Sequence, residues 1–421
     1  SKPMKNPTEI RKPLSHIRVL DLTHAVMGPC ASLMLADLGA DVVHIEPPEG
    51  DPTRSLKGFG MGYFPFYNRN KRSLAVDLKS EQGLAVVRRL AKECDVFIEN
   101  FGPGTADRLG LSYATLKELN PRLVYCSLKG FLSGPYEERH AMDEVVQMMG
   151  GLAYMTGPRH QPLRAGTSVV DITGGMFGAM GVLTALYERE RTGEGALIRS
   201  SLFETTAFLM GQHMAYAAQS AAPIPPMPER QSAWSVYQIF SSKDALPVFI
   251  GIISDRHWTR FCEAFQKPEW SADTRLATNN GRIAEKEWLL PAITAMLATL
   301  TAAEIIERCE AVNIPFAPVA RPEDLFTDPQ LNQQGRLLDV NVQEKTVGLP
   351  ALPLEWNGES FALELQPPSV GEHTHEVLTQ LGYSQQDIDS LAREKIIRLG
   401  SAHDNGKNQN KKETTQGRQQ P

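Results

Sequence analysis

A short apolar segment that ends in a carboxylate is the part of this chain best suited to chemistry. Residues 164–175 read Arg-Ala-Gly-Thr-Ser-Val-Val-Asp-Ile-Thr-Gly-Gly, so Asp171 stands where an apolar run meets the start of a long helical pattern. Free backbone N–H groups and the helix dipole at such a position favour an ionised acid. The segment therefore predicts either a reactive carboxylate at Asp171 or an aspartate that merely caps the helix.

The helix expected after Asp171 is unusually rich in glycine, which is a poor helix former. Its glycines are Gly174, Gly175, Gly178 and Gly181. Glycine at these positions is favoured where another backbone packs closely against the helix or where a ligand approaches. We therefore expect close packing or a bound ligand beside this helix.

Two other polar segments are candidates for ligand binding. Residues 99–105, Glu-Asn-Phe-Gly-Pro-Gly-Thr, follow an expected strand. They form either a plain turn or a set of polar groups at the carboxyl edge of a sheet. Residues 68–73, Asn-Arg-Asn-Lys-Arg-Ser, form a basic loop that is either solvated or a cradle for phosphate.

Three common kinds of site are not supported by the sequence. The turn at residues 23–29 lacks the G-x-G-x-x-G pattern of nicotinamide dinucleotide sites, although Glu46 ends the next strand as such sites require. His373 and His375 are spaced too loosely for a metal site, and we expect them at a solvated helix start. No G-x-S-x-G nucleophile motif occurs. We therefore expect no bound metal.

Strands and helices alternate in the first part of the chain. The strands are expected at residues 16–22, 40–46, 96–99 and 123–128. The helices are expected from the turn at 23–29 to about residue 38, and at 81–92, 113–119, 174–190 and 202–218. This alternation predicts an α/β domain with a mostly parallel sheet.

Prolines between residues 223 and 228 indicate a stiff linker, which divides the chain into segments. The expected segments are the N-terminal part of a large domain at 13–220, the linker at 221–231, a small domain at 232–330, a return segment and C-terminal part of the large domain at 331–400, and a disordered tail at 401–421. The small domain should contain a hairpin of residues 237–240 and 247–251, with helices near 255–265, 285–297 and 302–309. Helices are expected again from residue 371 and at 385–397.

Bulk composition excludes several classes of partner. The formal net charge is -6, and no basic block stands outside the tail, so we expect no nucleic acid partner. We identify no apolar run of about 18 residues and no signal peptide, so we expect no membrane association. The five cysteines are far apart, which favours reduced thiols and a cytoplasmic location.

Seven motifs, in this order along the chain, connect it to a known family. They are Arg18-Val-Leu-Asp21-Leu-Thr, Gly39-Ala-Asp-Val-Val-His-Ile-Glu46, Asn70-Lys-Arg-Ser-Leu-Ala-Val-Asp77-Leu-Lys79, Glu99-Asn100-Phe-Gly-Pro-Gly104, Asn120-Pro-Arg-Leu, Gly166-Thr-Ser-Val-Val-Asp171 and Gly371-Glu-His-Thr. From about residue 17 to residue 399 the chain resembles the class III CoA transferases. That family includes formyl-CoA and carnitine CoA transferases and the α-methylacyl-CoA racemases.

The resemblance implies a fold, an assembly and a set of site residues. The implied fold is α/β, with a Rossmann-like large domain built from both ends of the chain and a small central α+β domain, in an interlocked homodimer. The family's nucleophile falls on Asp171. Its CoA contacts fall on Ala25, Val26, Met27, Val76, Asp77, Leu78, Lys79, Asn100, Phe101, Gly102, Arg108 and His140. Met142, Asp143 and Arg164 are candidates on the substrate side, and coenzyme A or acyl-CoA is a substrate rather than a permanently bound cofactor.

The chemistry suits a carboxylate nucleophile. A carboxylate can attack a thioester carbonyl and release CoA thiolate, leaving a mixed anhydride that keeps the acyl group activated without ATP. The thiolate can then return to give an enzyme–CoA thioester, which an acceptor carboxylate attacks. Such an acid must be ionised and shielded from water, and it needs N–H groups nearby for the developing oxyanion.

The resemblance favours the transferase branch over the racemase branch. Racemases need acid and base groups on both faces of the α-carbon, and in racemase relatives these fall on positions that are Met142 and Ser254 here. His140 and Asp255 are close enough in sequence to leave a shifted geometry open.

The resemblance says less about which carboxylic acid accepts CoA. Oxalate-specific relatives carry an aromatic residue at the position of Met142, and formyl-CoA transferases have a glycine-rich loop that is missing between residues 228 and 237. We therefore expect a larger acceptor such as a C4–C5 dicarboxylate, with succinyl-CoA as donor. Its second carboxylate would meet Arg139, Arg164 or Arg230. A racemase or epimerase, an intramolecular CoA-transferring isomerase and a non-catalytic CoA-binding protein remain as alternatives.

Overall fold

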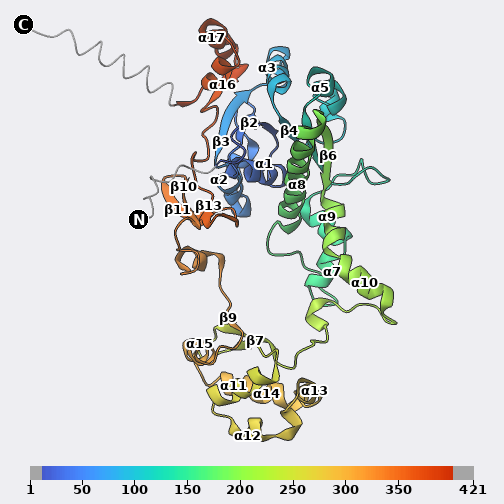
Figure 1. The fold of residues 1–421 in the computed structure, drawn as a ribbon, viewed down its shortest axis with the longest axis vertical. Helices are drawn as coiled ribbons and strands as arrows, with labels where there is room; N and C mark the ends of the chain where they lie inside the picture. Colours follow the sequence, from blue (N-terminus) through green and yellow to red (C-terminus); the bar gives the residue numbers. More distant parts are fainter. Residues whose placement is uncertain (1–11, 402–421) are drawn as a thin grey trace, which may run out of the picture. The chain divides into compact units, whose positions relative to one another are not determined.

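In the computed structural model, residues 12–401 are described, and the chain forms two compact units (Figure 1). Unit 1 combines the chain up to Pro228 with the chain from Pro329 onward, and unit 2 is Glu229–Asp328. Of the tail expected at residues 401–421, all but Ser401 lies outside the described residues.

A seven-stranded sheet forms the centre of unit 1. Its strands are β1 (Arg18–Leu22), β2 (Asp41–Glu46), β3 (Lys71–Val76), β4 (Val96–Glu99), β5 (Val124–Lys129), β6 (Ala196–Ser201) and β14 (Ile397–Arg398). Their order is β14-β3-β2-β1-β4-β5-β6, and every pairing is parallel except that of β14 with β3. The predicted α/β fold with a mostly parallel sheet is confirmed. The order 3-2-1-4-5-6 is that of a doubly wound fold, with its switch point between β1 and β4.

One face of this sheet is covered by helices from both ends of the chain. They are α3 (Glu81–Glu93), α5 (Tyr113–Leu119), α16 (Thr374–Gln380) and α17 (Gln385–Arg393). Leu84 of α3, Leu378 of α16 and Ile388 of α17 share one buried core with Phe97 of β4. Figure 1 shows the C-terminal helices (red) beside α3 (blue). Burial of this shared apolar surface fixes the C-terminal segment onto the sheet.

The opposite face is covered chiefly by α1 (Met27–Asp37) and α8 (Val169–Thr192), together with α6 (Asp143–Met149) and α9 (Leu202–Leu209). The glycines of α8 allow its close approach to α1 and the sheet. A Cβ atom on Gly175 would lie 2.7 Å from the carbonyl oxygen of Met27, and one on Gly178 would lie 2.8 Å from Leu128 Cδ2. The predicted close packing beside this helix is confirmed.

Helix α8 is also apolar enough to raise the question of a membrane span. Among residues 12–401 it is the one single helix whose length and composition would allow it to cross a membrane, and 44% of its most apolar 18-residue stretch is buried. The expectation that the chain contains no apolar stretch of this length is therefore wrong. The helix contacts α1, β5 and β6, so we interpret it as a core helix of unit 1.

The expectation of a basic loop at residues 68–73 is wrong. Lys71, Arg72 and Ser73 begin the buried strand β3, and the cations of this segment form ion pairs with aspartates of neighbouring elements. The pairs are Arg69–Asp37 at 2.8 Å, Lys71–Asp21 at 3.1 Å and Arg72–Asp41 at 2.8 Å. These cations are neutralised inside the fold, so they form no phosphate cradle.

Other element boundaries differ from the sequence expectations. The helix expected at 202–218 is broken at Met210 into α9 and α10 (Gly211–Gln219), and the helix expected at 385–397 ends at Arg393 before β14. Strand β6 was not expected.

The remaining short elements of unit 1 complete its outline. The helices are α2 (Tyr63–Tyr67), α4 (Thr105–Leu109) and α7 (Leu152–Thr156), with the 3₁₀ helices η1 (Pro52–Ser55) and η2 (Gly58–Gly62). Two hairpins are formed by β10 (Leu337–Val342) with β11 (Lys345–Pro350), and by β12 (Glu355–Trp356) with β13 (Glu359–Ser360).

Unit 2 packs helices on a small antiparallel sheet. The strands are β7 (Tyr237–Ser241), β8 (Pro247–Gly251) and β9 (Phe316–Pro318), and Tyr237 pairs with Gly251 as the expected hairpin requires. The helices are α11 (Asp255–Ala264), α12 (Pro268–Ala272), α13 (Asn279–Ala284), α14 (Lys286–Leu297) and α15 (Ala302–Ala311). Trp258 and Phe261 are central to its core. Unit 2 therefore has a hydrophobic core of its own.

Candidate active site

A cavity of about 500 Å³ opens at the carboxyl edge of the unit 1 sheet. One wall is the turn that follows β1, residues 24–27, and another is the loop that follows β4, residues 100–103. Because the sheet order changes direction between β1 and β4, the cavity lies at the switch point where doubly wound folds bind ligands. Asp171 also lines it.

Asn100 holds these two walls together. Its Nδ2 donates a hydrogen bond to the carbonyl oxygen of His24 at 3.0 Å, and its Oδ1 accepts a longer one of 3.4 Å from the His24 N–H. The next residue, Ala25, has a φ of 68°, a left-handed conformation that non-glycine residues seldom adopt. The first turn is therefore held in an unusual backbone shape where it faces the cavity.

Asp143, rather than Asp171, caps helix α8. Its Oδ2 accepts hydrogen bonds from the backbone N–H groups of Val170 (2.9 Å) and Asp171 (2.8 Å). Asp171 is the third residue of α8, and within residues 12–401 its carboxylate makes no hydrogen bond. The interpretation of Asp171 as a simple capping residue is therefore wrong, and its carboxylate is left free at the cavity.

The same arrangement changes the acidity of Asp171. Burial and the nearby Asp143 carboxylate raise the pKa of Asp171 to about 7, against a smaller opposing effect of Arg164. The expectation that the helix start would favour an ionised acid is wrong, because Asp143 occupies the N–H groups that would have stabilised the charge. A carboxylate with this pKa is partly ionised at neutral pH and is a stronger nucleophile when ionised.

A buried amide fixes Asp143 in turn. Gln147 Nε2 donates a short hydrogen bond to Asp143 Oδ1, and Gln147 Oε1 accepts one of 2.8 Å from the Ala165 N–H. Arg164 Nη2 lies 3.9 Å from Asp143 Oδ1. Asp143 lines the cavity, but its oxygens are used to position the start of α8.

The structure gathers most of the predicted site residues around one cavity. Those that line it are Ala25, Val26, Met27, Asn100, Phe101, Gly102, His140, Met142, Asp143, Arg164 and Asp171. Val76, Asp77, Leu78, Lys79 and Arg108 are not part of the lining. Val76 ends β3, so the residues after it lie at the same edge of the sheet as the cavity, two strands from β1.

Arg139 and Arg164 line the cavity, whereas Arg230 belongs to unit 2 and is not in the lining. Arg164 lies 3.6 Å from Glu144, so the nearby carboxylate partly neutralises the charge of its guanidinium. The Arg139 guanidinium lies 4.1 Å above the ring of Tyr136, and it forms no ion pair within the described part of the chain. Arg139 is therefore the less engaged of the two cations at the cavity.

Sequence reasoning missed several lining residues, notably His24, Tyr63, Lys129 and Ser168. Lys129 ends β5 and binds Glu99 at 2.8 Å and the carbonyl oxygen of Phe101 at 2.7 Å. Its place at the carboxyl end of a strand was a usable signal. Tyr63 begins α2, and no local pattern connects it with the other walls.

The expectation of a solvated helix start at His373 is also wrong. Its Nδ1 accepts a hydrogen bond from the Ser73 N–H at 3.0 Å, and the neighbouring Thr374 Oγ1 accepts one from the Ala75 N–H at 3.1 Å. The Gly371–Thr374 motif therefore docks against β3. In the part of the chain that the structure describes, no group of three or more His, Cys, Asp and Glu side chains is arranged to hold a metal ion.

Comparison with known proteins agrees with the fold. Residues 14–374 match CoA-transferase family III. The chain is 34% identical to a succinate–glutarate CoA-transferase of Agrobacterium fabrum over 88% of this chain and 96% of that protein. It is 35% identical to an acetyl-CoA:oxalate CoA-transferase of Acetobacter aceti over 84% and 91%. A crystal structure of a CAIB/BAIF family protein from Brucella suis superposes with a TM-score of 0.80 at 31% identity, covering 88% of this chain and all of that one. These matches confirm the resemblance seen in the motifs, and the chain belongs to CoA-transferase family III.

Proposed function

We propose that this protein moves CoA from an acyl-CoA donor to a carboxylic acid acceptor, with Asp171 as the nucleophile. One observation carries the assignment of Asp171. Its carboxylate lines a cavity at the switch point of the sheet while Asp143 takes over the capping of its helix. The names of the relatives support the reaction type, because they are CoA-transferases.

The proposed reaction proceeds through three covalent intermediates, an anhydride, a thioester and a second anhydride, and consumes no water. Asp171 attacks the donor thioester carbonyl, and the C–S bond breaks. CoA thiolate is released, and a mixed anhydride of Asp171 and the acyl group remains. The thiolate then attacks the aspartyl carbonyl, so that the donor acid leaves and an enzyme–CoA thioester forms. The acceptor carboxylate attacks this thioester to give a second anhydride, and the thiolate attacks the acceptor carbonyl to release the new acyl-CoA and Asp171.

The proposed CoA contacts follow the walls of the cavity and the neighbouring sheet edge. The first turn and the Asn100 loop would hold the pantetheine arm, because both line the cavity that contains Asp171. Residues 76–79 would hold a more distant part of the nucleotide, since they lie at the same edge two strands away. Arg108 would add positive charge for the phosphates, and His140 a ring nitrogen for hydrogen bonding.

We propose a C4–C5 dicarboxylate as acceptor and succinyl-CoA as donor. The Agrobacterium relative is named for succinate and glutarate, and the Acetobacter relative for oxalate, at nearly the same identity. Met142 is 65% exposed at the cavity, where a flexible apolar side chain leaves room for a longer acid. Arg139 is the candidate for its second carboxylate, because Arg164 already faces Asp143 and Glu144.

The racemase alternative is less well supported by the side chains. Met142 has no ionisable group. Ser254 caps α11 by accepting a hydrogen bond from the His257 N–H, and Asp255 lies 2.8 Å from the buried Arg282. A shifted racemase geometry would need His140 and Asp255; His140 lines the cavity, but Asp255 is already ion-paired within unit 2. We therefore favour transfer.

We further propose a cytoplasmic, interlocked homodimer whose large domain is unit 1 and whose small domain is unit 2. The resemblance to the family supports this assembly. Apolar side chains on the outside of α8, α9 and α10 support it as well, because they are exposed in the single chain. They include Met176, Met180, Phe208 and Met214.

The deciding experiment is a panel of carboxylic acids incubated with succinyl-, acetyl- and formyl-CoA, with the CoA esters separated by liquid chromatography. We expect new esters with dicarboxylates and none with Asp171→Asn. Hydroxylamine added after the donor should convert Asp171 to a hydroxamate that peptide mass spectrometry locates. Turnover by Asp171→Asn, or a hydroxamate at another residue, would contradict the proposed mechanism. Rearrangement of one acid's CoA ester without an acceptor would indicate the isomerase instead.

A further inference from the structure

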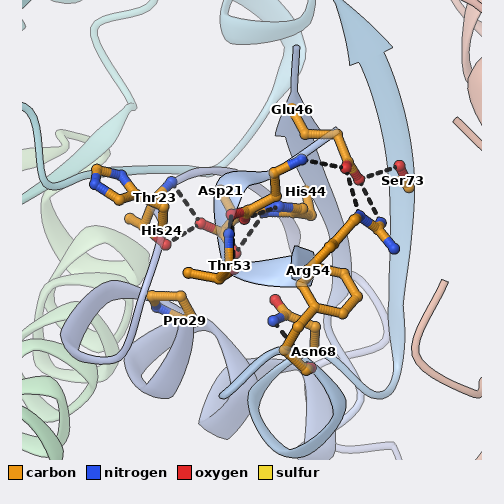
Figure 2. A network of polar contacts seen from close by, with 12 residues as sticks. Asp21, Thr23, His24, Pro29, His44, Glu46, Thr53, Arg54, Asn68 and Ser73 are labelled. Atoms are coloured by element: carbon orange, nitrogen blue, oxygen red, sulfur yellow. Dashed lines mark hydrogen bonds and ion pairs between the residues drawn. The ribbon is translucent and has the colours of Figure 1, made fainter. Parts of the chain in front are cut away.

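A buried cluster of charges lies beneath the first turn of the cavity (Figure 2). It consists of the carboxylates Asp21, Glu46 and Asp51 and the cations His44, Arg54 and Lys71. We call these six residues the charged cluster. They come from β1, β2, β3 and η1, together with Asp51 just before η1. Buried charges are costly unless they are paired and hydrogen-bonded, so this arrangement needs a reason.

One end of the charged cluster anchors the first turn. Asp21 Oδ1 accepts hydrogen bonds from the backbone N–H of Thr23 at 2.9 Å and from its hydroxyl group. Asp21 Oδ2 accepts from Ser32 of α1 at 2.7 Å and from Lys71 at 3.1 Å. Residues 24–27, which line the cavity, follow directly after Thr23. Asp21 therefore sets where this wall begins.

The other end supports the wall that carries Tyr63. Asp51 Oδ1 caps η1 by accepting hydrogen bonds from the Thr53 N–H (2.9 Å) and hydroxyl (2.6 Å). Arg54 of η1 binds both oxygens of Glu46 at 2.7 Å and lies 3.8 Å above the ring of Phe64. Phe64 is the neighbour of Tyr63 in α2, and Tyr63 lines the cavity.

His44 is the link between the two ends. Its Nε2 forms a hydrogen bond of 3.0 Å with Asp51 Oδ2, its Nδ1 lies at an ion-pair distance of 3.4 Å from Asp21 Oδ2 without a hydrogen bond, and its side chain is 1% exposed. Both ring nitrogens face a carboxylate, which only the doubly protonated imidazolium can satisfy. Protonation also balances the charged cluster, because three carboxylates then face three cations. Burial lowers the pKa of His44, but Asp21 and Asp51 together raise it to about 9.

We propose that the His44 imidazolium is a positioning residue that joins the two walls of the acyl-CoA cavity through Asp21 and Asp51. This inference rests on the proposed use of the cavity for CoA. His44 does not line the cavity, so it acts on the shape of the binding site rather than on the reacting atoms. Its loss should therefore weaken CoA binding more than it slows the covalent steps.

The test compares three variants with the wild type. His44→Gln removes the positive charge, His44→Lys keeps it, and Arg189→Met removes a different buried cation. Arg189 binds Asp95 at 2.8 Å just before β4, at the opposite edge of the sheet from the cavity. We expect His44→Gln to raise the KM for acyl-CoA about tenfold while kcat changes less than about threefold. His44→Lys should recover most of the loss, and Arg189→Met should lower stability without raising KM.

A binding measurement separates this inference from the proposed reaction. Titration calorimetry of free CoA into each variant, made also in the Asp171→Asn background, requires no turnover. Weaker CoA binding in His44→Gln, with recovery in His44→Lys, supports the inference even if the wild type transfers nothing to the acids tested. Equal CoA affinity in wild type and His44→Gln overturns it. If His44→Gln does not fold, Asp51→Asn removes the charge on the other side of the same contact and is judged by the same affinities.

Discussion

At the scale of single residues, the site depends on two aspartates with opposite roles. Asp143 accepts hydrogen bonds from the backbone N–H groups of Val170 and Asp171 at the start of α8. The Asp171 carboxylate therefore receives no hydrogen bond from these groups. Burial raises the pKa of Asp171, and the nearby Asp143 carboxylate raises it further because like charges close together disfavour ionisation. One carboxylate thus positions the helix, and the other is the proposed nucleophile.

Asp171→Asn should abolish transfer while retaining CoA affinity within about threefold, because it removes the proposed nucleophile but preserves the shape of its side chain. It should also stabilise the fold at pH 8. Since the native pKa of Asp171 is raised, ionising it costs more in the folded than in the unfolded chain, and the wild type loses stability as pH rises from about 4 to about 7. The difference, about 4 kcal/mol at pH 8 for a pKa raised by about three units, should shrink to about 1–2 kcal/mol at pH 5. Urea denaturation at both pH values checks this, and a less stable Asn variant at pH 8 would contradict it.

The pH dependence of kcat/KM for the acyl-CoA donor should report the ionisation of Asp171. The rate should rise with pH through about 7, because the ionised form is the nucleophile. Asp143→Asn should move this rise to lower pH, since it removes the repelling charge but keeps an oxygen that can accept the two N–H bonds. A profile unchanged in Asp143→Asn would show that another group controls it. Asp41→Asn, which changes a carboxylate at the opposite edge of the sheet, is the matched control.

At the scale of elements, α8 and α1 meet so closely that their glycines are structural requirements. Gly175 faces backbone atoms of α1, whereas Gly181 faces the side chain of Ile198. A backbone neighbour cannot move without shifting its helix, but a side chain can often change rotamer. The position of α8, and with it of Asp171, therefore depends on the contact at Gly175.

Gly175→Ala should destabilise unit 1 by about 1–3 kcal/mol, because its Cβ would lie 2.7 Å from the Met27 carbonyl oxygen. The gain in helix propensity of about 1 kcal/mol does not offset this clash. Met27 lines the cavity, so the KM for acyl-CoA should rise as well. Gly181→Ala is the matched control and should lose less stability. Urea denaturation with equal midpoints for Gly175→Ala and the wild type would refute the close contact.

At the scale of the whole molecule, the exposed apolar residues of α8 to α10 are the main feature that a single chain leaves unexplained. Phe208 is 71% exposed and stacks edge to face on Phe177 at 5.3 Å. Large exposed apolar patches on soluble proteins mark interaction surfaces. The proposed partner is a second copy of this chain.

Light scattering should give twice the mass of one chain. Phe208→Glu should shift the protein toward the monomer, because it places a charge in the proposed contact. Phe59→Glu changes a similarly exposed aromatic residue on η2 and should leave the mass unchanged. A monomer mass for the wild type would contradict the homodimer.

The sequence alone determined the parts of this protein that local patterns encode. Apolar runs and turn residues predicted β1, β2, β4, β5 and the principal helices, and the motif around Asp171 predicted the start of α8. Only the tertiary structure decided which charges are used inside the fold. Lys71 looked like a surface cation because its partner Asp21 is 50 residues away in sequence. Likewise, the acidity of Asp171 depends on Asp143, which lies on another helix. Pairing and burial set these properties, and both arise only when distant segments meet.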